Sequence, residues 1–464
     1  MLEINRRNLT EGNIFFNLLY LAVPAVVTTL FHTLYNLIDT FWVGKIDAVS
    51  VAAVSLAFTV IFILISILSG ISIGISAVVA KHYGAKKIGY VKRIIGQTVV
   101  IGIITVFLCY IFTILLLRHV LSLLGRGIPS QLFALTYNYL IIIFSGSFGI
   151  IFTFFMNGVM RGIGDTKTPM FILMFSSALN IILDPVLIFG IPPFPRLNIY
   201  GAAIATVVSR ITAAFLSFFY VVSILRPKHI IDLPDMKIIK EIFSIGIPTI
   251  LTQLSTAIGV ATIMSMVVKY GPLTVAAFGI AFRVEAIAIL PIIGINIAII
   301  SLIGQNLGAE KYERLFKTVK SALYITIAFL SVISLAIILF SNRITGIFNE
   351  NPEVMKIGAQ YFRLIPLSYI AVGICLNIVA VYQGLGLATT GLFLTLLRYW
   401  IMIIPLSYLF SFILKGGIAG IWYGIVAGHW LGAIISVIFM FNRIVIGSSF
   451  PEGDIKYPDI IVIE

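Results

Sequence analysis

Long apolar stretches dominate the chain, separated by short segments that carry charged residues, Gly or Pro. A helix needs about 20 consecutive apolar residues to cross the hydrocarbon core of a bilayer, and these stretches reach that length. Hydropathy, with breaks placed at charged residues, Gly and Pro, predicts twelve such helices. We expect them over residues 14–43, 50–80, 92–118, 130–157, 168–190, 199–225, 240–269, 274–306, 315–341, 355–381, 389–413 and 417–444.

The composition supports the same class. Of the 464 residues, 60% are hydrophobic and 11% are charged, and the mean hydropathy is +1.11. Soluble proteins carry about 25% charged residues, so we predict an all-α polytopic membrane protein without a sizeable soluble domain. The first apolar stretch lacks the features of a cleavable signal peptide and is expected to be a retained helix. Cys109 and Cys375 lie in apolar runs, which favours small core residues over a disulfide.

The basic residues predict the orientation in the membrane. The net charge of +13 does not indicate nucleic-acid binding, because no groove-entering motif accompanies it. Three loops hold most of the excess: Lys81, Lys86, Lys87, Lys92 and Arg93; then Arg226, Lys228, Lys237 and Lys240; then Lys311, Arg314, Lys317 and Lys320. By the positive-inside rule, this pattern predicts a multi-pass protein of the cell membrane, embedded in the lipid bilayer with both termini in the cytoplasm.

An internal repeat divides the chain into two halves of the same orientation. LAVPAVVTTL around Pro24 resembles IGIPTILTQL around Pro248, and VAAVSLAF at Val51 resembles VAAFGIAF at Val275, with 224 residues between the members of each pair. Parallel repeats of this kind are a known plan of transporters, whose site lies at or near the repeat interface. We expect an N-terminal lobe over residues 1–225, a cytoplasmic linker over 226–240 and a C-terminal lobe with a short tail over 241–464.

Acidic residues interrupt three of the predicted spans. Of the 18 acids, Asp39, Asp184 and Glu285 lie within apolar stretches. An acid in such a segment is costly, usually faces the bundle interior and often marks an ion or substrate path, although it can also satisfy a local backbone group. The repeat places Ile263 opposite Asp39, and no acid in the eleventh predicted helix corresponds to Asp184. We therefore interpret these two as a functional pair of the N-terminal lobe and leave both interpretations open for Glu285.

Helical spacing places further polar groups beside the two acids. Asn180 and Asp184 lie one turn apart on one face, and Tyr35 and Asn36 share a face with Asp39. Two carboxylates with amide and hydroxyl oxygens form a hard-oxygen site that suits Na⁺ or a shared proton.

Two hydroxyl groups from other predicted helices reach a comparable depth. Tyr139 lies in the fourth and Thr206 in the sixth predicted helix. Both residue types are also common where membrane helices pack, which is the alternative role for each.

Several motifs resemble those of the multidrug and toxic compound extrusion (MATE) family. These are YNLxD in the first predicted helix, RGxGD after the fourth and LNxxLDP in the fifth, and the similarity covers essentially the whole chain. The resemblance points to the prokaryotic branch with its coupling acids in the N-terminal lobe. It implies a monomer that exports small organic, often cationic, compounds by rocking of two lobes, with H⁺ or Na⁺ as coupling ion and no other cofactor. The cation site that it implies consists of Asp39, Asn180, Asp184 and Thr206, with Tyr139 hydrogen-bonded to Asp184.

Five more residues are candidates for gating or substrate contact. Pro24 is a candidate hinge, because bending of the first helix is linked to protonation in the family, although prolines are frequent in membrane helices generally. His32 lies two turns before the first acid and is either a second titrating group or a hydrogen-bonded pore residue. Asn157 matches a family position implicated in ligand contact. Arg283 and Glu285 are expected to link to a neighbouring helix.

Other function classes have weaker support. GIGD at 162–165 mimics an intramembrane aspartyl protease motif, but it is expected in a basic cytoplasmic loop. No ATP-binding or common hydrolase motif occurs, so we predict that the protein is not an enzyme. The alternative to an antiporter is a flippase for a lipid-linked oligosaccharide precursor. That function favours a cavity lined by several Arg and Lys residues, whereas the spans offer only scattered cases such as Arg210, Arg283, Arg363 and Arg398.

Overall fold

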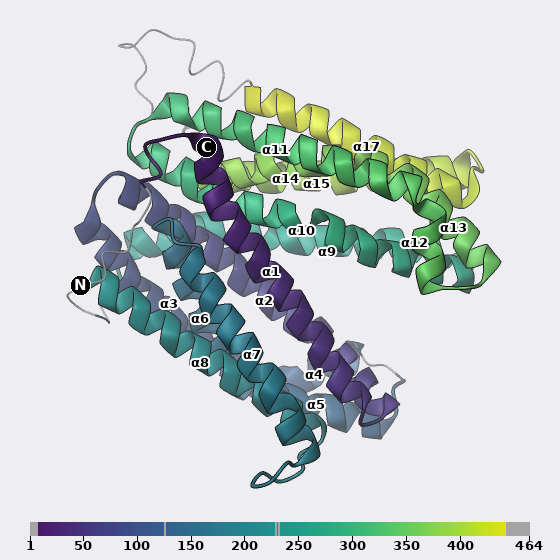
Figure 1. The fold of residues 1–464 in the computed structure, drawn as a ribbon, viewed down its shortest axis with the longest axis horizontal. Coiled ribbons are helices and arrows are strands. Elements are labelled where there is room, and N and C mark those ends of the chain that lie inside the picture. Colours follow the sequence, from purple (N-terminus) through teal and green to yellow (C-terminus); the bar gives the residue numbers. More distant parts are fainter. Residues whose placement is uncertain (1–7, 125–126, 228–229, 231–232, 442–464) are drawn as a thin grey trace. The chain divides into compact units, whose positions relative to one another are not determined.

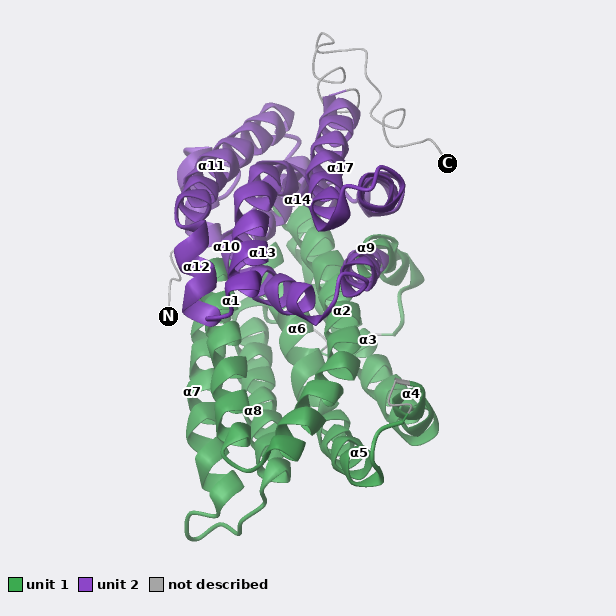
Figure 2. Ribbon diagram, turned by 90° about the vertical axis from the view of Figure 1, so that its right-hand side faces the viewer, with its two compact units in different colours: residues 1–6, 23–250 green, residues 7–22, 251–464 purple. Residues whose placement is uncertain are grey.

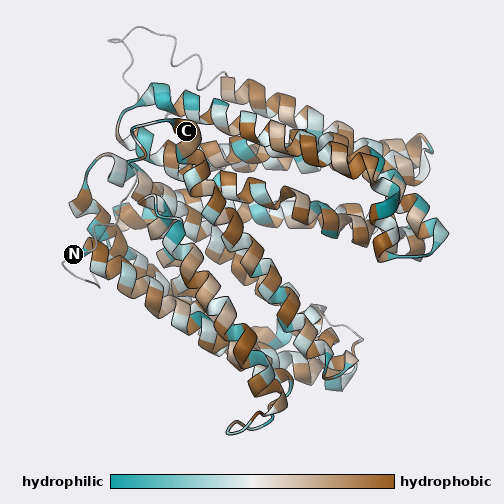
Figure 3. Ribbon diagram, viewed as in Figure 1, coloured by the Kyte–Doolittle hydropathy of each residue, from teal (hydrophilic) through white to brown (hydrophobic). Residues whose placement is uncertain are grey.

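The computed structural model describes residues 8–124, 127–227, 230 and 233–441, and its regular elements in these ranges are helices. Within these described residues, eleven helices are long and apolar enough to cross a membrane, or twelve when a bent pair is counted as one span. The predicted all-α membrane architecture is thereby confirmed. Hydrophobic residues predominate along the helices, with hydrophilic ones interspersed among them (Figure 3). The predicted linker lies partly, and the tail beyond residue 441 wholly, outside the described residues.

The chain forms two compact units, coloured separately in Figure 2. Unit 1 comprises residues 23–250 and unit 2 comprises residues 8–22 and 251–441 of the described part. The helices of the first half are α1 (Ile14–Gly44), α2 (Ala48–Gly84), α3 (Ile88–Leu115), α4 (Leu117–Leu124), α5 (Ser130–Ser145), α6 (Ser147–Gly162), α7 (Lys167–Phe189) and α8 (Ile199–Leu225) (Figure 1).

The second half follows the same order with more breaks. It contains α9 (Met236–Val268), α10 (Pro272–Gly308), α11 (Tyr312–Leu339), α12 (Ser341–Phe348), α13 (Pro352–Leu364), the 3₁₀ turn η1 (Ile365–Ser368), α14 (Tyr369–Gly384), α15 (Ala388–Leu396), the π-helical segment η2 (Leu397–Ile403), α16 (Ile404–Tyr408), the π-helical segment η3 (Leu409–Ile413) and α17 (Gly417–Met440).

Two predicted spans are interrupted for identifiable reasons. The span predicted over 130–157 bends by 51° between α5 and α6. A Cβ on Gly146, at the bend, would lie 2.3 Å from a methyl group of Val207, so glycine allows α8 to pass close to the bend. In unit 2, the span predicted over 355–381 contains η1, where Pro366 has no N–H to continue the α-helical ladder.

Small residues let the helices of each unit approach closely. In unit 1, a Cβ on Gly158 of α6 would lie 2.6 Å from the carbonyl oxygen of Ser72 on α2, and the Ser72 hydroxyl donates to the Phe154 carbonyl at 2.6 Å. In unit 2, Gly424 and Gly428 of α17 approach the backbone of α16 and η2 in the same way. Close approach of this kind is the main source of helix association where lipid replaces water.

Each half of the chain begins with a short segment before its first long helix. The segment before α9 is held within unit 1, and the segment before α1 is held within unit 2. In unit 1, Gln97 of α3 donates to the Leu233 carbonyl at 2.8 Å and accepts from the Asp235 amide at 2.9 Å, and Arg93 pairs with Asp235 at 2.7 Å. Glu241 adds contacts of 3.3 Å with Lys81 and 3.2 Å with the His82 ring. We call the contacts of residues 93 and 97 with 233 and 235 the unit 1 clamp.

Unit 2 holds the N-terminal segment mainly through Arg314, and Lys311 adds a hydrogen bond to the Thr10 carbonyl at 2.9 Å. Arg314 of α11 donates to the carbonyls of Leu9, Glu11 and Gly12 at 3.2, 3.1 and 3.0 Å, and to Asn306 at 2.9 Å. Leu9 and Leu233 occupy equivalent positions of the repeat. We call the contacts of Arg314 with this segment the unit 2 clamp.

Candidate functional site

Unit 1 buries the two predicted acids on different helices. Asp39 lies on α1 and is 7% exposed, and Asp184 lies on α7 and is fully buried. The predicted pairing on α7 is formed, because the Asn180 amide donates to Asp184 Oδ1 at 3.3 Å. Pro185 follows directly and cannot donate to the carbonyl one turn earlier, so α7 lacks one backbone hydrogen bond beside the acid.

Three buried oxygens of this group have no hydrogen-bond partner among the described residues. They are Asp39 Oδ1, Asp184 Oδ2 and Asn180 Oδ1. Asp39 also lies within electrostatic reach of Asp184. Buried polar atoms are nearly always hydrogen-bonded in folded proteins. Acceptor oxygens without a donor on two neighbouring helices therefore form a place suited to a cation or a proton.

One further helix, α8, contributes a hydroxyl group and a cation. Thr206 of α8 lies 3.3 Å from the Tyr35 hydroxyl, and the Arg210 guanidinium lies over the Tyr35 ring at 5.0 Å from its centre. Asn36 and His32 are hydrogen-bonded to each other at 3.2 Å. A small pocket, too narrow to hold a water molecule, is lined by Tyr35, Ser176, Ser177, Asn180, Thr206, Ser209 and Arg210.

Tyr139 lies near the acids without the bond that the resemblance implies. Its side chain, on α5, is buried and within electrostatic reach of both Asp39 and Asp184. Among the described residues, no hydrogen bond joins its hydroxyl group to Asp184, whose bonded partner is Asn180. The implied Tyr139–Asp184 hydrogen bond is therefore absent from this structure.

An apolar cluster closes one end of the site. Val43 of α1, Ile188 of α7 and Ala202 of α8 pack together, with Trp42 and Phe189 against them. Each of the three lies one helical turn from a polar residue of the site: Val43 from Asp39, Ile188 from Asp184 and Ala202 from Thr206. The cluster therefore separates the polar groups from the end of unit 1 where α1 and α7 end.

The remaining predicted residues lie elsewhere in the two units. Pro24 is buried in α1, where the Thr28 hydroxyl donates to its carbonyl at 2.7 Å. Asn157 of α6 is half-buried, and its Oδ1 has no partner among the described residues. In unit 2, Arg283 is exposed, whereas Glu285 of α10 accepts a hydrogen bond from Tyr361 of α13. Glu285 is thus linked to a neighbouring helix.

The sequence interpretation did not assign Arg210 to the site. The sequence spacing could have indicated it, because Arg210 follows Thr206 by one helical turn and shares its face of α8. No group of three or more His, Cys, Asp or Glu side chains gathers into a metal site within the described residues. A metal cation at this site would therefore depend on the two carboxyl groups together with amide and hydroxyl oxygens.

Comparison with known proteins covers nearly the whole chain. The MatE family model matches residues 24–186 and again residues 248–409, one match in each half. A probable multidrug resistance protein, YoeA of Bacillus subtilis, is 27% identical over 87% of this chain and 88% of its own length. An FAD transporter of Shewanella oneidensis is 26% identical, with coverage of 88% and 91%. An outward-facing structure of a multidrug resistance MATE family transporter superposes with a TM-score of 0.85 at 27% identity, covering 95% of this chain and 98% of that one.

Proposed function

The chain belongs to the MatE family of membrane transporters, and on that premise we propose that it is a cation-coupled antiporter that exports small organic compounds. Relatives named as multidrug resistance and multidrug export proteins support this class of substrate. The observation that carries the coupling is the pair of buried carboxyl groups with open oxygens, Asp39 Oδ1 and Asp184 Oδ2.

Cation binding at this pair lowers the free-energy cost of keeping the two carboxylates buried. A carboxylate out of water is costly unless it is paired, so uptake of H⁺ or Na⁺ removes much of that cost. Coupling requires that the cation and the substrate favour different conformations, because a ligand shifts an equilibrium only by its differential affinity for the two states. Arg210 adds a fixed positive charge over Tyr35, and an incoming cation has to bind against its repulsion.

The proposed orientation assigns a role to the apolar cluster of Val43, Ile188 and Ala202. With the basic loops and both termini in the cytoplasm, the cluster lies on the outer side of the acids. It then acts as the barrier that cations from outside have to pass. Opening of this barrier is the local step by which the outer gradient reaches the site.

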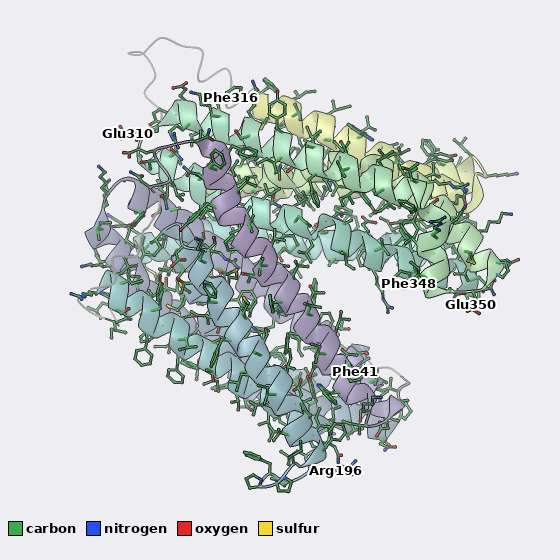
Figure 4. The ribbon with its side chains drawn as sticks, in the orientation of Figure 1. Phe41, Arg196, Glu310, Phe316, Phe348 and Glu350 are labelled. Atoms are coloured by element: carbon green, nitrogen blue, oxygen red, sulfur yellow. The ribbon has the colours of Figure 1, made fainter. Side chains whose placement is uncertain are left out.

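The test measures efflux driven by an imposed gradient. Full-length protein in proteoliposomes is loaded with ethidium, and efflux is followed under a pH gradient and then under a Na⁺ gradient. Asp39→Asn and Asp184→Asn are expected to lower gradient-driven efflux by about 5- to 150-fold, the usual size of a coupling free energy. The matched control is Glu350→Gln, which removes an acid between α12 and α13 that lies outside the site (Figure 4).

Unimpaired efflux from both Asn variants, with normal amounts of folded protein, would overturn the proposal. The gradient that drives efflux in the parent protein identifies the coupling ion. A parallel assay with FAD, the compound named for the Shewanella relative, tests whether the exported compounds include anions.

A further inference from the structure

Unit 2 buries an arginine without an acidic partner. Arg398, in the π-helical segment η2, is 4% exposed. Its Nε and Nη1 groups have no hydrogen-bond acceptor among the described residues. Within the same part of the chain, no carboxylate lies within salt-bridge distance of its guanidinium.

The surroundings of Arg398 are aromatic or small. Its guanidinium lies 4.9 Å from the centre of the Tyr399 ring, and the Cys375 thiol of α14 lies within hydrogen-bonding reach of it. Cys375 packs with Ala371 and Ala433 in an apolar cluster. Gly432 of α17 makes room for the side chain, because a Cβ there would lie 2.8 Å from Arg398 Cγ.

A second buried nitrogen without a hydrogen-bond partner lies on α17, on the same face as Gly432. His429 precedes Gly432 by one turn, is 7% exposed, and has no partner for Nδ1 among the described residues. Its ring meets the Tyr399 ring edge to face, at 6.3 Å between centres and 83° between planes. Arg398 and His429 therefore flank the same tyrosine and lie within electrostatic reach of each other.

Glu285, which lies within electrostatic reach of Tyr399, is already engaged. Glu285 accepts a hydrogen bond from Tyr361, whose ring packs against Trp422 and Phe278. A buried guanidinium keeps its charge at every physiological pH, and leaving it unpaired in an apolar interior destabilises the protein. Buried donors without an acceptor are rare in folded proteins. The Arg398 nitrogens therefore indicate an acceptor that the described residues do not provide.

We propose that Arg398 and His429 form a binding site for a small monovalent anion within unit 2. Arg398 donates from Nε and Nη1, and His429 donates from Nδ1 in the tautomer that carries its proton there. The low exposure of both side chains limits the ligand to the size of a halide ion or a single carboxylate group. This site is separate from the acids of unit 1 and does not depend on the proposed transport function.

The test measures anion-dependent stability of the purified full-length protein. Thermal unfolding in detergent is compared in sodium chloride, bromide and formate, with sodium gluconate as the bulky reference anion at equal ionic strength. We expect chloride and bromide to raise the melting temperature by about 3 °C or more in a saturable way, since a ligand that binds only the folded state stabilises it. A shift with formate and none with halides would identify a carboxylate as the ligand.

Variants connect the effect to the two side chains. Arg398→Gln should abolish the shift, and His429→Gln should raise the half-maximal anion concentration about tenfold, the loss of one hydrogen bond to a charged group. The control Arg363→Gln, which removes an exposed arginine of the same unit that contacts Asn342, should retain the shift. If Arg398→Gln does not fold, Arg398→Lys keeps the charge, and its shift should move to higher anion concentration.

Two results would overturn the proposal. One is the same melting temperature in all four salts for the parent protein. The other is an anion-dependent shift that Arg398→Gln and Arg398→Lys leave unchanged. A bromide-soaked crystal then gives a direct check, because the anomalous peak has to lie in contact with the Arg398 guanidinium.

Discussion

Units 1 and 2 share a helical plan but bury opposite kinds of polar group. Unit 1 leaves carboxyl oxygens of Asp39 and Asp184 without partners, whereas unit 2 leaves guanidinium nitrogens of Arg398 without partners. The position of unit 2 that is equivalent to Asp39 holds Ile263, which is buried. The comparison teaches that a duplicated scaffold constrains helix packing and leaves the interior chemistry of each half free to differ.

The two clamps also differ in the contacts that form them. The unit 1 clamp combines one ion pair, Arg93 with Asp235, and two hydrogen bonds of the neutral Gln97 side chain to the backbone. The unit 2 clamp depends mainly on backbone carbonyls that accept from the charged Arg314. Arginine thus binds a carboxylate in the unit 1 clamp and backbone carbonyls in the unit 2 clamp.

The largest expected effect follows from making unit 1 resemble unit 2. Asp39→Ile copies the equivalent residue of unit 2 and removes the open carboxyl group while keeping a buried side chain. We expect gradient-driven ethidium efflux to fall by about 5- to 150-fold. The melting temperature should not fall, because the variant replaces a costly buried acid by an apolar group. Ile263→Val is the matched control, and retained efflux in Asp39→Ile would contradict the comparison.

A smaller effect is expected when the unit 2 clamp is broken. Arg314→Ala removes the guanidinium that donates to three backbone carbonyls and so removes a hydrogen-bond donor from each of them. We expect a loss of about 2 kcal/mol in the free energy of unfolding, the value of hydrogen bonds to a charged donor. Thermal or denaturant unfolding in detergent measures it. Arg314→Lys should recover part of the loss. An unchanged melting temperature in Arg314→Ala would show that these hydrogen bonds contribute little to stability.

The smallest effect is expected in the unit 1 clamp. Arg93→Ala breaks an ion pair whose arginine is more than half exposed. Such pairs contribute about 0.2–1 kcal/mol and weaken as salt rises. The difference between parent and variant should therefore shrink in high salt, whereas that of Arg314→Ala should persist. Equal losses for the two variants would mean that the clamps do not differ energetically.

Most of the fold could be predicted from the sequence because twenty-residue apolar runs leave few alternatives in a membrane. The bend at Gly146 could not, because its cause is Val207, a residue of a distant helix. The pairing of Asn180 with Asp184 could be predicted because both share one helix face. The neighbours of Arg398 could not, because Cys375 and Gly432 come from separate helices.

The assignment of residues 8–22 to unit 2 has a consequence for biosynthesis. Leu9 is translated about three hundred residues before Arg314, which holds it. The opening turns of α1 therefore wait for the synthesis of α2 to α11 before their binding site exists. The chain completes the anchoring of residues 8–22 only after α11 has been made.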